Sequence, residues 1–115
     1  INSQMKVYRS FVSLAELMSV ALGTFEELEI GESFVFDVSG TEVVEIGELA
    51  LKIKQLLHSE AEIVRGALNK ETTDRYLGSS QEYTDLIRKL EISPHSLKDQ
   101  ILCTALYLKK IVNPE

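Results

Sequence analysis

The sequence predicts a mixed α+β lobe of about four helices and a few short strands. Three observations lead to this fold class. Apolar residues recur at helical spacing in four runs, most clearly over about residues 45–59. Short stretches rich in β-branched and aromatic residues, at 7–13, 33–38 and 61–65, alternate with these runs. The 115 residues, 44% hydrophobic and 26% charged, have the composition of one folded domain, or of a piece of a larger one.

The first expected strand, residues 7–13, carries an arginine between apolar neighbours. Strand alternation places Val7, Arg9 and Phe11 on one face. A guanidinium buried without an anion or water is very unfavourable, so Arg9 needs a partner. Two partners fit the pattern, a carboxylate of this chain or a bound anion.

A helix is expected directly after this strand. Ser13 and Glu16 form a capping box, in which the serine accepts a hydrogen bond from the first turn and the glutamate reaches back to the cap. We expect the helix to end where Gly23 opens a polar connection. Its apolar face consists of Leu14, Leu17, Met18, Ala21 and Leu22.

The middle of the chain alternates expected strands and a helix. Residues 33–38 are expected to form a strand and residues 39–41 a turn. An amphipathic helix follows, from about Glu45 to about Ser59. Residues 61–65 suggest a further short strand. The polar stretch after it, residues 66–80, has little pattern of its own, which is typical of functional loops.

Two more helices are expected before the end of the chain. The first is marked by Tyr83, Leu86, Ile87 and Leu90 and is broken at Pro94. Ser96 and Asp99 resemble a second capping box and begin the last helix, about residues 97–112. This helix is apolar almost all round, so the sequence predicts that a partner surface covers it.

The composition excludes several kinds of function. A net charge of −6 and a pI near 5.0 argue against nucleic-acid and anionic-membrane binding, and no apolar run is long enough to span a bilayer. The single cysteine, Cys103, excludes an internal disulfide framework and fits a cytoplasmic location; we expect its thiol to be buried. His58 and His95 have no partners at metal-ligand spacing, so no metal site is expected.

The motifs of several enzyme classes are missing from these residues. The glycines form no dinucleotide or phosphate loop, no tyrosine precedes a lysine by four residues, and no catalytic centre is encoded. Two arginines remain, Arg9 and Arg75, and the planar fork of arginine suits phosphate. In the alternative reading Arg9 pairs with Glu16 or another carboxylate, and Arg75 pairs with Asp74 or lies in solvent.

Four segments, in order, resemble the extended short-chain dehydrogenases, the NAD-dependent sugar-nucleotide epimerases and dehydratases. "RSFVSLAEL" is similar to their R-D-F-I-H-V-D-D-L stretch, and "FVFDVSGTEVVEIGELALKI" to Y-N-I-G-S-G-E-E-V-S-I-R-E-L-A. "DRYLGSS" resembles their R-Y motif, and "SLKDQILCTALYL" their closing helix. Asp37 stands where the family usually has Asn, and Glu45 where it has Ser.

The resemblance implies that residues 1–115 are the carboxy-terminal substrate-binding lobe of a longer Rossmann-type enzyme, a reading that the start at Ile1 also suggests. A preceding Rossmann domain would carry the NAD(P) loop and the catalytic Tyr/Lys pair, so this segment would hold no cofactor itself. Arg9 and Arg75 would clamp the diphosphate of a nucleotide-sugar. The implied partners are that substrate, the protein's own Rossmann domain and a second copy of the full-length protein.

Two other hypotheses stay open. The substitutions at Ala15, Asp37 and Glu45 are compatible with a relative that has the same fold and no catalysis. Alternatively, the chain is an unrelated small acidic α+β interaction module that binds a partner through its last helix.

Overall fold

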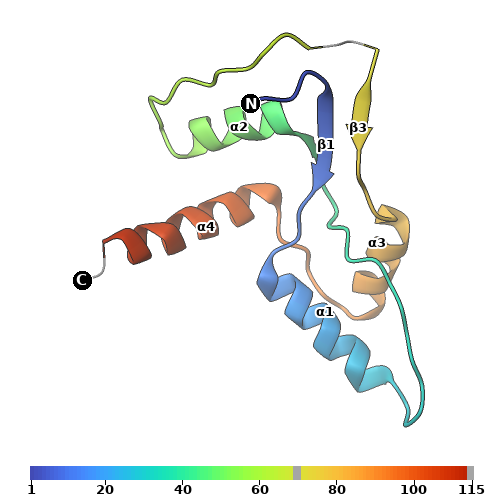
Figure 1. Cartoon of the computed structure of the whole chain (residues 1–115). Helices are drawn as coiled ribbons and strands as arrows, with labels where there is room; N and C mark the ends of the chain where they lie inside the picture. Colours follow the sequence, from blue (N-terminus) through green and yellow to red (C-terminus); the bar gives the residue numbers. More distant parts are fainter. Residues whose placement is uncertain (69–70, 114–115) are drawn as a thin grey trace.

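The computed structural model describes residues 1–68 and 71–113 (Figure 1). This part of the chain folds into four helices and one three-stranded sheet, which confirms the predicted mixed α+β class. The strands are β1 (Lys6–Ser10), β2 (Val43–Glu45) and β3 (Thr73–Arg75). The helices are α1 (Leu14–Glu27), α2 (Ile46–Leu56), α3 (Ser80–Lys89) and α4 (Leu97–Val112). An origin as a lobe of a Rossmann-type enzyme stays a prediction.

The sheet has β1 at its centre, in the order β2-β1-β3. β2 runs antiparallel to β1, with Arg9 opposite Val44, and β3 runs parallel to β1, with Tyr8 opposite Arg75. The first predicted strand is therefore present, although it ends at Ser10.

The other two predicted strands are wrong. Residues 33–38 and 61–65 form no strand, whereas 43–45 and 73–75, for which no strand was predicted, pair with β1. A strand has two edges, and these two segments occupy both edges of β1. Residues 33–38 instead direct apolar side chains onto the helices beside them.

The helix starts agree closely with the sequence patterns. The hydroxyl of Ser13 accepts from the N–H of Glu16 at 3.1 Å, and the hydroxyl of Ser96 accepts from the N–H of Asp99 at 3.1 Å. The expected end of α1 at Gly23 is wrong, because the helix continues to Glu27. A β-carbon at Gly23 would lie 3.4 Å from the side chain of Leu90, so this glycine lets the residue that follows α3 pack closely against α1.

Two small hydrophobic clusters hold the elements together. Val20, Tyr83 and Ile87 join α1 to α3, with Phe36 and Val38 packed against them. The second cluster joins β2, α2 and α4 and consists of Val44, Leu97 and Ile101, with Leu49 and Leu56 packed against them. These six buried side chains, of which only Val20 and Tyr83 are fully buried, are the whole apolar core of the described residues.

A buried carboxylate supports the first cluster. Glu16 is 3% exposed and accepts hydrogen bonds from the hydroxyl of Tyr83 at 2.5 Å and from the N–H of His95 at 2.7 Å. It does not reach back to the helix cap as the capping box predicted, because these two donors hold its carboxylate between α1, α3 and the connection to α4. Burial and the hydrogen bond to Glu16 raise the pKa of Tyr83, which keeps its hydroxyl protonated as a donor.

A second buried carboxylate, that of Glu45, holds the sheet to α2. Arg65 donates to both of its oxygens, at 2.5 and 2.7 Å. The N–H of Val7 on β1 donates at 3.3 Å, and the N–H of Gly47 in the first turn of α2 donates at 2.9 Å. The hydrogen bonds from Arg65, opposed by desolvation, lower the pKa of Glu45 to about 2.

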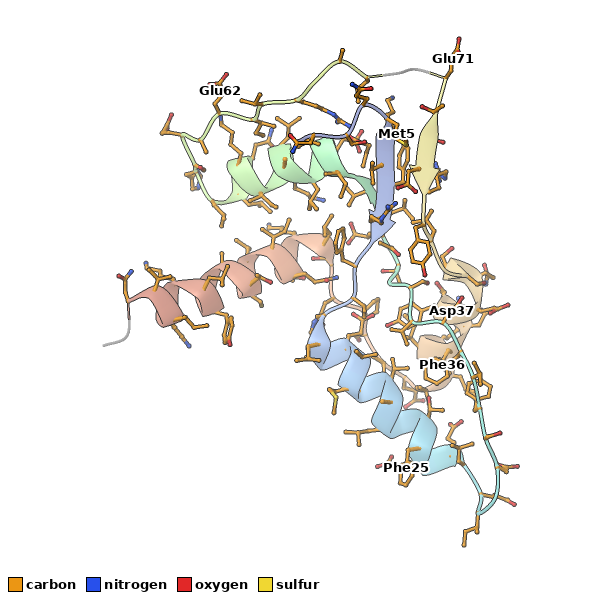
Figure 2. All side chains as sticks on the ribbon, in the orientation of Figure 1. Met5, Phe25, Phe36, Asp37, Glu62 and Glu71 are labelled. Atoms are coloured by element: carbon orange, nitrogen blue, oxygen red, sulfur yellow. The ribbon has the colours of Figure 1, made fainter. Side chains whose placement is uncertain are left out.

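The molecule is flat and exposes much apolar surface. Its extents are 53 × 48 × 20 Å, and its radius of gyration is 17.3 Å, against about 13 Å for a compact domain of this length. Over its C-terminal half α4 extends away from the other elements, with side chains projecting on both sides (Figures 1 and 2). The exposed side chains include Leu106, Tyr107, Leu108, Ile111 and Val112. Cys103 is exposed as well, so the expectation of a buried thiol is wrong.

The hydrogen bond between Tyr83 and Glu16 can be tested by Tyr83→Phe. This change leaves the buried carboxylate short of a donor, which should lower the free energy of unfolding by about 1–3 kcal/mol. Urea unfolding followed by helical circular dichroism measures the loss. Tyr107→Phe removes the same hydroxyl from an exposed ring, and its effect should stay within about 0.5 kcal/mol. Equal effects of the two changes would contradict the assignment.

The Glu45 carboxylate should make stability depend on pH in acid. Because its pKa is lower in the folded state, its contribution is complete above about 4.5, the ordinary value, and disappears as the pH falls towards 2. The stability difference between the unchanged protein and Glu45→Gln should therefore shrink by on the order of 2–3 kcal/mol between pH 5 and pH 2. Glu62→Gln, at an exposed position, is the matched control and should show no such trend.

Candidate functional site

A polar pocket of about 380 Å³ lies where the end of β1 meets two connecting segments. One segment, residues 37–39, leads towards β2, and the other, residues 76–78, leads from β3 to α3. Figure 2 shows Asp37 on the first of these segments, beside α3. The residues that give the pocket its chemistry are Arg9, Ser10, Asp37, Ser39, Tyr76 and Gly78.

Two glycines allow the walls of this pocket to come together. Gly40 has a φ of +69°, and a β-carbon there would lie 2.3 Å from the carbonyl oxygen of Phe11. A β-carbon at Gly78 would lie 2.8 Å from the β-carbon of Ser39 and 3.4 Å from Oδ2 of Asp37. The two connecting segments therefore touch each other and the chain beyond β1, which fixes the shape of the pocket.

Arg9 supplies the positive charge of the pocket. Its Nη1 donates to the carbonyl oxygen of Tyr8 at 2.7 Å, and its Nη2 donates to Oδ2 of Asp74 at 2.6 Å. The guanidinium carbon also lies 6.0 Å from the centroid of the Tyr76 ring. These two hydrogen bonds use part of the five N–H groups of arginine, and 30% of the Arg9 side chain is exposed. The guanidinium can therefore donate further hydrogen bonds to a ligand.

Arg75, the second candidate from the sequence, lies on the opposite face of the sheet. Tyr8 and Arg75 are paired in register, and residues paired across two strands point to the same face of the sheet. Arg9 follows Tyr8 in the strand and therefore points to the opposite face. The Arg75 guanidinium lies 4.5 Å from the centroid of the Tyr8 ring. Arg9 contacts Asp74 and Tyr76, which flank Arg75 in the chain. The structure does not bring the two arginines together.

Carboxylates balance the charge of Arg9. Asp74 forms the ion pair, and the Arg9 hydrogen bond, opposed by desolvation, lowers the pKa of Asp74. Asp37 is among the residues that line the pocket, whereas Asp74 contacts Arg9 without being one of them. An ionised aspartate only accepts hydrogen bonds, so Asp37 suits a ligand that presents hydroxyl or N–H groups. Arg9 and Asp37 together fit a ligand with both an anionic group and hydrogen-bond donors.

Sequence reasoning found Arg9 and missed most of its surroundings. It named Asp74 only as a partner for Arg75, whereas the structure pairs it with Arg9. The register of β3 on β1 decides this pairing, and β3 was expected to be irregular. Strand alternation could have revealed this pairing, because it places Asp74 and Tyr76 on one face of a strand and Arg75 on the other.

The described residues also limit other kinds of site. They contain no group of three or more His, Cys, Asp or Glu side chains able to hold a metal. No helix among them has the length and apolar character needed to cross a membrane. A separate apolar groove of about 300 Å³ between α2 and α4 is lined by residues such as Leu49, Ile53 and Ala105. It lacks the charged groups of the polar pocket.

Comparison of this chain with protein-family models, curated proteins and solved structures gives no match. The family resemblance of the four sequence segments therefore stays a prediction. Any assignment of function depends on those motifs and on the chemistry of the pocket.

Proposed function

We propose that this chain is the substrate-binding region of an NAD(P)-dependent sugar-nucleotide epimerase or dehydratase, and that Arg9 binds the diphosphate of the substrate. The observation that carries the proposal is the position of Arg9, which lines a polar pocket and, within residues 1–68 and 71–113, uses only two of its five N–H donors in hydrogen bonds. The pocket, about 380 Å³, lies within the range of small-molecule sites.

The chemistry of the pocket suits the two ends of such a substrate. A guanidinium donates two parallel hydrogen bonds to phosphate oxygens, and Asp37 and Ser39 offer acceptors to ribose or sugar hydroxyls. Binding at these non-reacting groups orients the sugar for hydride transfer, which the proposed Rossmann domain with NAD(P) would perform. The residues of this chain bind and position, and the proposal gives them no chemical step.

Arg75 has a weaker place in this proposal. Its guanidinium is exposed, and its position over the Tyr8 ring faces away from the Arg9 pocket. A diphosphate clamp made by both arginines requires the Arg75 side chain to leave Tyr8 and pass the edge of β3. We therefore propose Arg9 as the direct contact and Arg75 as a second contact only in a rearranged, ligand-bound form.

The large accessible surface of the chain, which includes many apolar side chains, supports the proposed partner domain. A compact monomer of 12.9 kDa exposes about 6,300 Å², and this chain exposes 8801 Å². The excess, about 2,500 Å², exceeds the roughly 800 Å² that each partner buries in a standard interface. A Rossmann domain of the same protein packed on α4 and α1 would cover this surface. The single cysteine fits a cytoplasmic enzyme.

The same surface favours a second candidate function, a protein-interaction module. In that case the 115 residues would form a stable monomer or dimer that ignores nucleotides. The two functions differ at Arg9, because an interaction module has no need of a guanidinium in the lining of a polar pocket.

Calorimetric titration of the full-length protein with uridine, thymidine, guanosine and cytidine diphosphates tests the assignment of Arg9. Arg9→Ala should weaken the binding of the preferred diphosphate about 10- to 100-fold, because a charge-assisted hydrogen bond contributes about 1.5–3 kcal/mol. Arg9→Lys should restore only part of the affinity, since lysine lacks the planar fork.

Arg88→Ala provides the control. Arg88 is exposed on α3 and pairs with Asp85, so its loss changes the net charge equally and leaves the pocket intact. Its affinity should match that of the unchanged protein. Undiminished binding by Arg9→Ala would remove the diphosphate assignment.

A further inference from the structure

We propose that Asp74 is a built-in competitor for the anion site, a carboxylate that occupies Arg9 in the free protein and is displaced when a phosphate group binds. This inference rests on the proposed function, because it concerns the same guanidinium. It adds a residue that determines which anions the site accepts.

The contacts of Arg9 are the first support. Its Nη2 lies 2.6 Å from Oδ2 of Asp74, the distance of a charge-assisted hydrogen bond. An anion that takes up the fork of Arg9 must use this N–H group or accept a poorer geometry. Asp74 and the ligand phosphate therefore compete for the same donor.

The strands hold Asp74 in its competing position. Val7 on β1 is paired in register with Asp74 on β3, so the carboxylate is carried beside Arg9 by the main chain. A tethered group competes at an effective concentration in the millimolar range or above. A dissolved anion with a single carboxylate offers Arg9 the same interaction as Asp74, so it has no advantage over the tethered group. A phosphate has more charge and more oxygens and can bond both sides of the fork.

Displacement leaves no buried charge behind. The Asp74 side chain is 42% exposed, and the Arg9 side chain is 30% exposed. After exchange the Asp74 carboxylate can turn into water, where its charge is solvated, and the strand pairing through Val7 is unaffected. The exchange needs side-chain rotation only, which makes it compatible with a rigid sheet.

The charges near Arg9 explain how such a competitor affects the binding of anionic ligands. Arg9 forms its ion pair with Asp74, and Asp37 is a second acidic residue in the lining of the pocket. With Asp74 in place the pocket has no excess positive charge, so weakly charged anions are not attracted. A diphosphate restores an ion pair with Arg9 only by removing Asp74 from it. Asp74 therefore raises the ligand concentration that the site needs, and a ligand gains over Asp74 only by bonding more of the fork, as a phosphate can.

The experiment is a double-mutant cycle on the full-length protein, with uridine 5′-diphosphate as the probe and uridine as the uncharged comparison. Asp74→Asn keeps the shape and removes the competing charge, so the affinity for the diphosphate should rise about 5- to 20-fold, with no change for uridine. In the Arg9→Ala background the same substitution should change the diphosphate affinity less than twofold.

Asp85→Asn is the matched control, because Asp85 also pairs with an arginine, but on the exposed surface of α3. It changes the net charge equally and should leave the affinity unchanged. A gain that persists in the Arg9→Ala background, or that Asp85→Asn reproduces, overturns the competition, since it would come from overall charge.

Failure of the inference and failure of the proposed function give different results. If Arg9→Ala weakens diphosphate binding and Asp74→Asn does not strengthen it, the competition is overturned and the function stands. If no variant binds the diphosphate, or if Arg9→Ala binds as well as the unchanged protein, both are overturned. Diphosphate binding that emerges only in Asp74→Asn overturns both, because the unchanged protein then binds no diphosphate and Asp74 is not displaced.

Discussion

The carboxylate of Glu16 is where α1, α3 and the connection to α4 meet. It accepts a hydrogen bond from a side chain 67 residues away and another from a main-chain N–H 79 residues away. Two further glutamates act in the same way. Glu45 accepts from the N–H of Val7, and Glu42 accepts from the N–H of Leu97 at 2.7 Å. Distant parts of the chain are thus joined by carboxylates bound to fixed donors, because the two small apolar clusters are too limited to fix the arrangement alone. For Glu45 the hydrogen bonds from Arg65 also lower the pKa, which keeps that carboxylate ionised.

The candidate site depends on this framework through β1. The strand is held on one side by β2, whose last residue is Glu45, and on the other by β3. Its central position determines that Arg9 faces the pocket and that Tyr8 faces Arg75. Gly40 and Gly78 then let the connecting segments lie close to each other and to the chain beyond β1, which forms the pocket that Arg9 lines. The sheet therefore determines the position of Arg9, and the two connecting segments form the pocket beside its guanidinium.

Local patterns in the sequence predicted the helices well and the sheet poorly. Ser13 and Ser96 mark true helix starts, because capping involves residues only three positions apart. Strand pairing depends on segments far apart in the sequence. Residues 43–45 pair with β1, although residues 33–38 have the stronger β pattern. Phe36 and Val38 pack instead against the cluster that contains Tyr83 and Ile87. The burial of Glu16 and the exposure of Cys103 were missed for a related reason. Composition does not reveal which side of a helix meets a neighbour, and α4 has neighbours mainly near its start. Arg9 was found because an arginine between apolar strand residues is conspicuous locally, whereas its pairing with Asp74 follows from the parallel register of β3.

The flat shape of the molecule and the partly exposed position of Arg9 are consistent with each other. A chain that leaves most of α4 uncovered gains little stability from a closed core, and it offers one side of a binding site. Arg9 and Asp37 can hold the phosphate and hydroxyl groups of a ligand, yet nothing in the described residues encloses the ligand from the opposite direction. Enclosure is what excludes water and strengthens the ion pair between a guanidinium and phosphate, because the interaction of two charges grows as the local dielectric constant falls. In the proposed enzyme the packing of a second domain against α4 and α1 would cover the apolar surface that the chain leaves exposed.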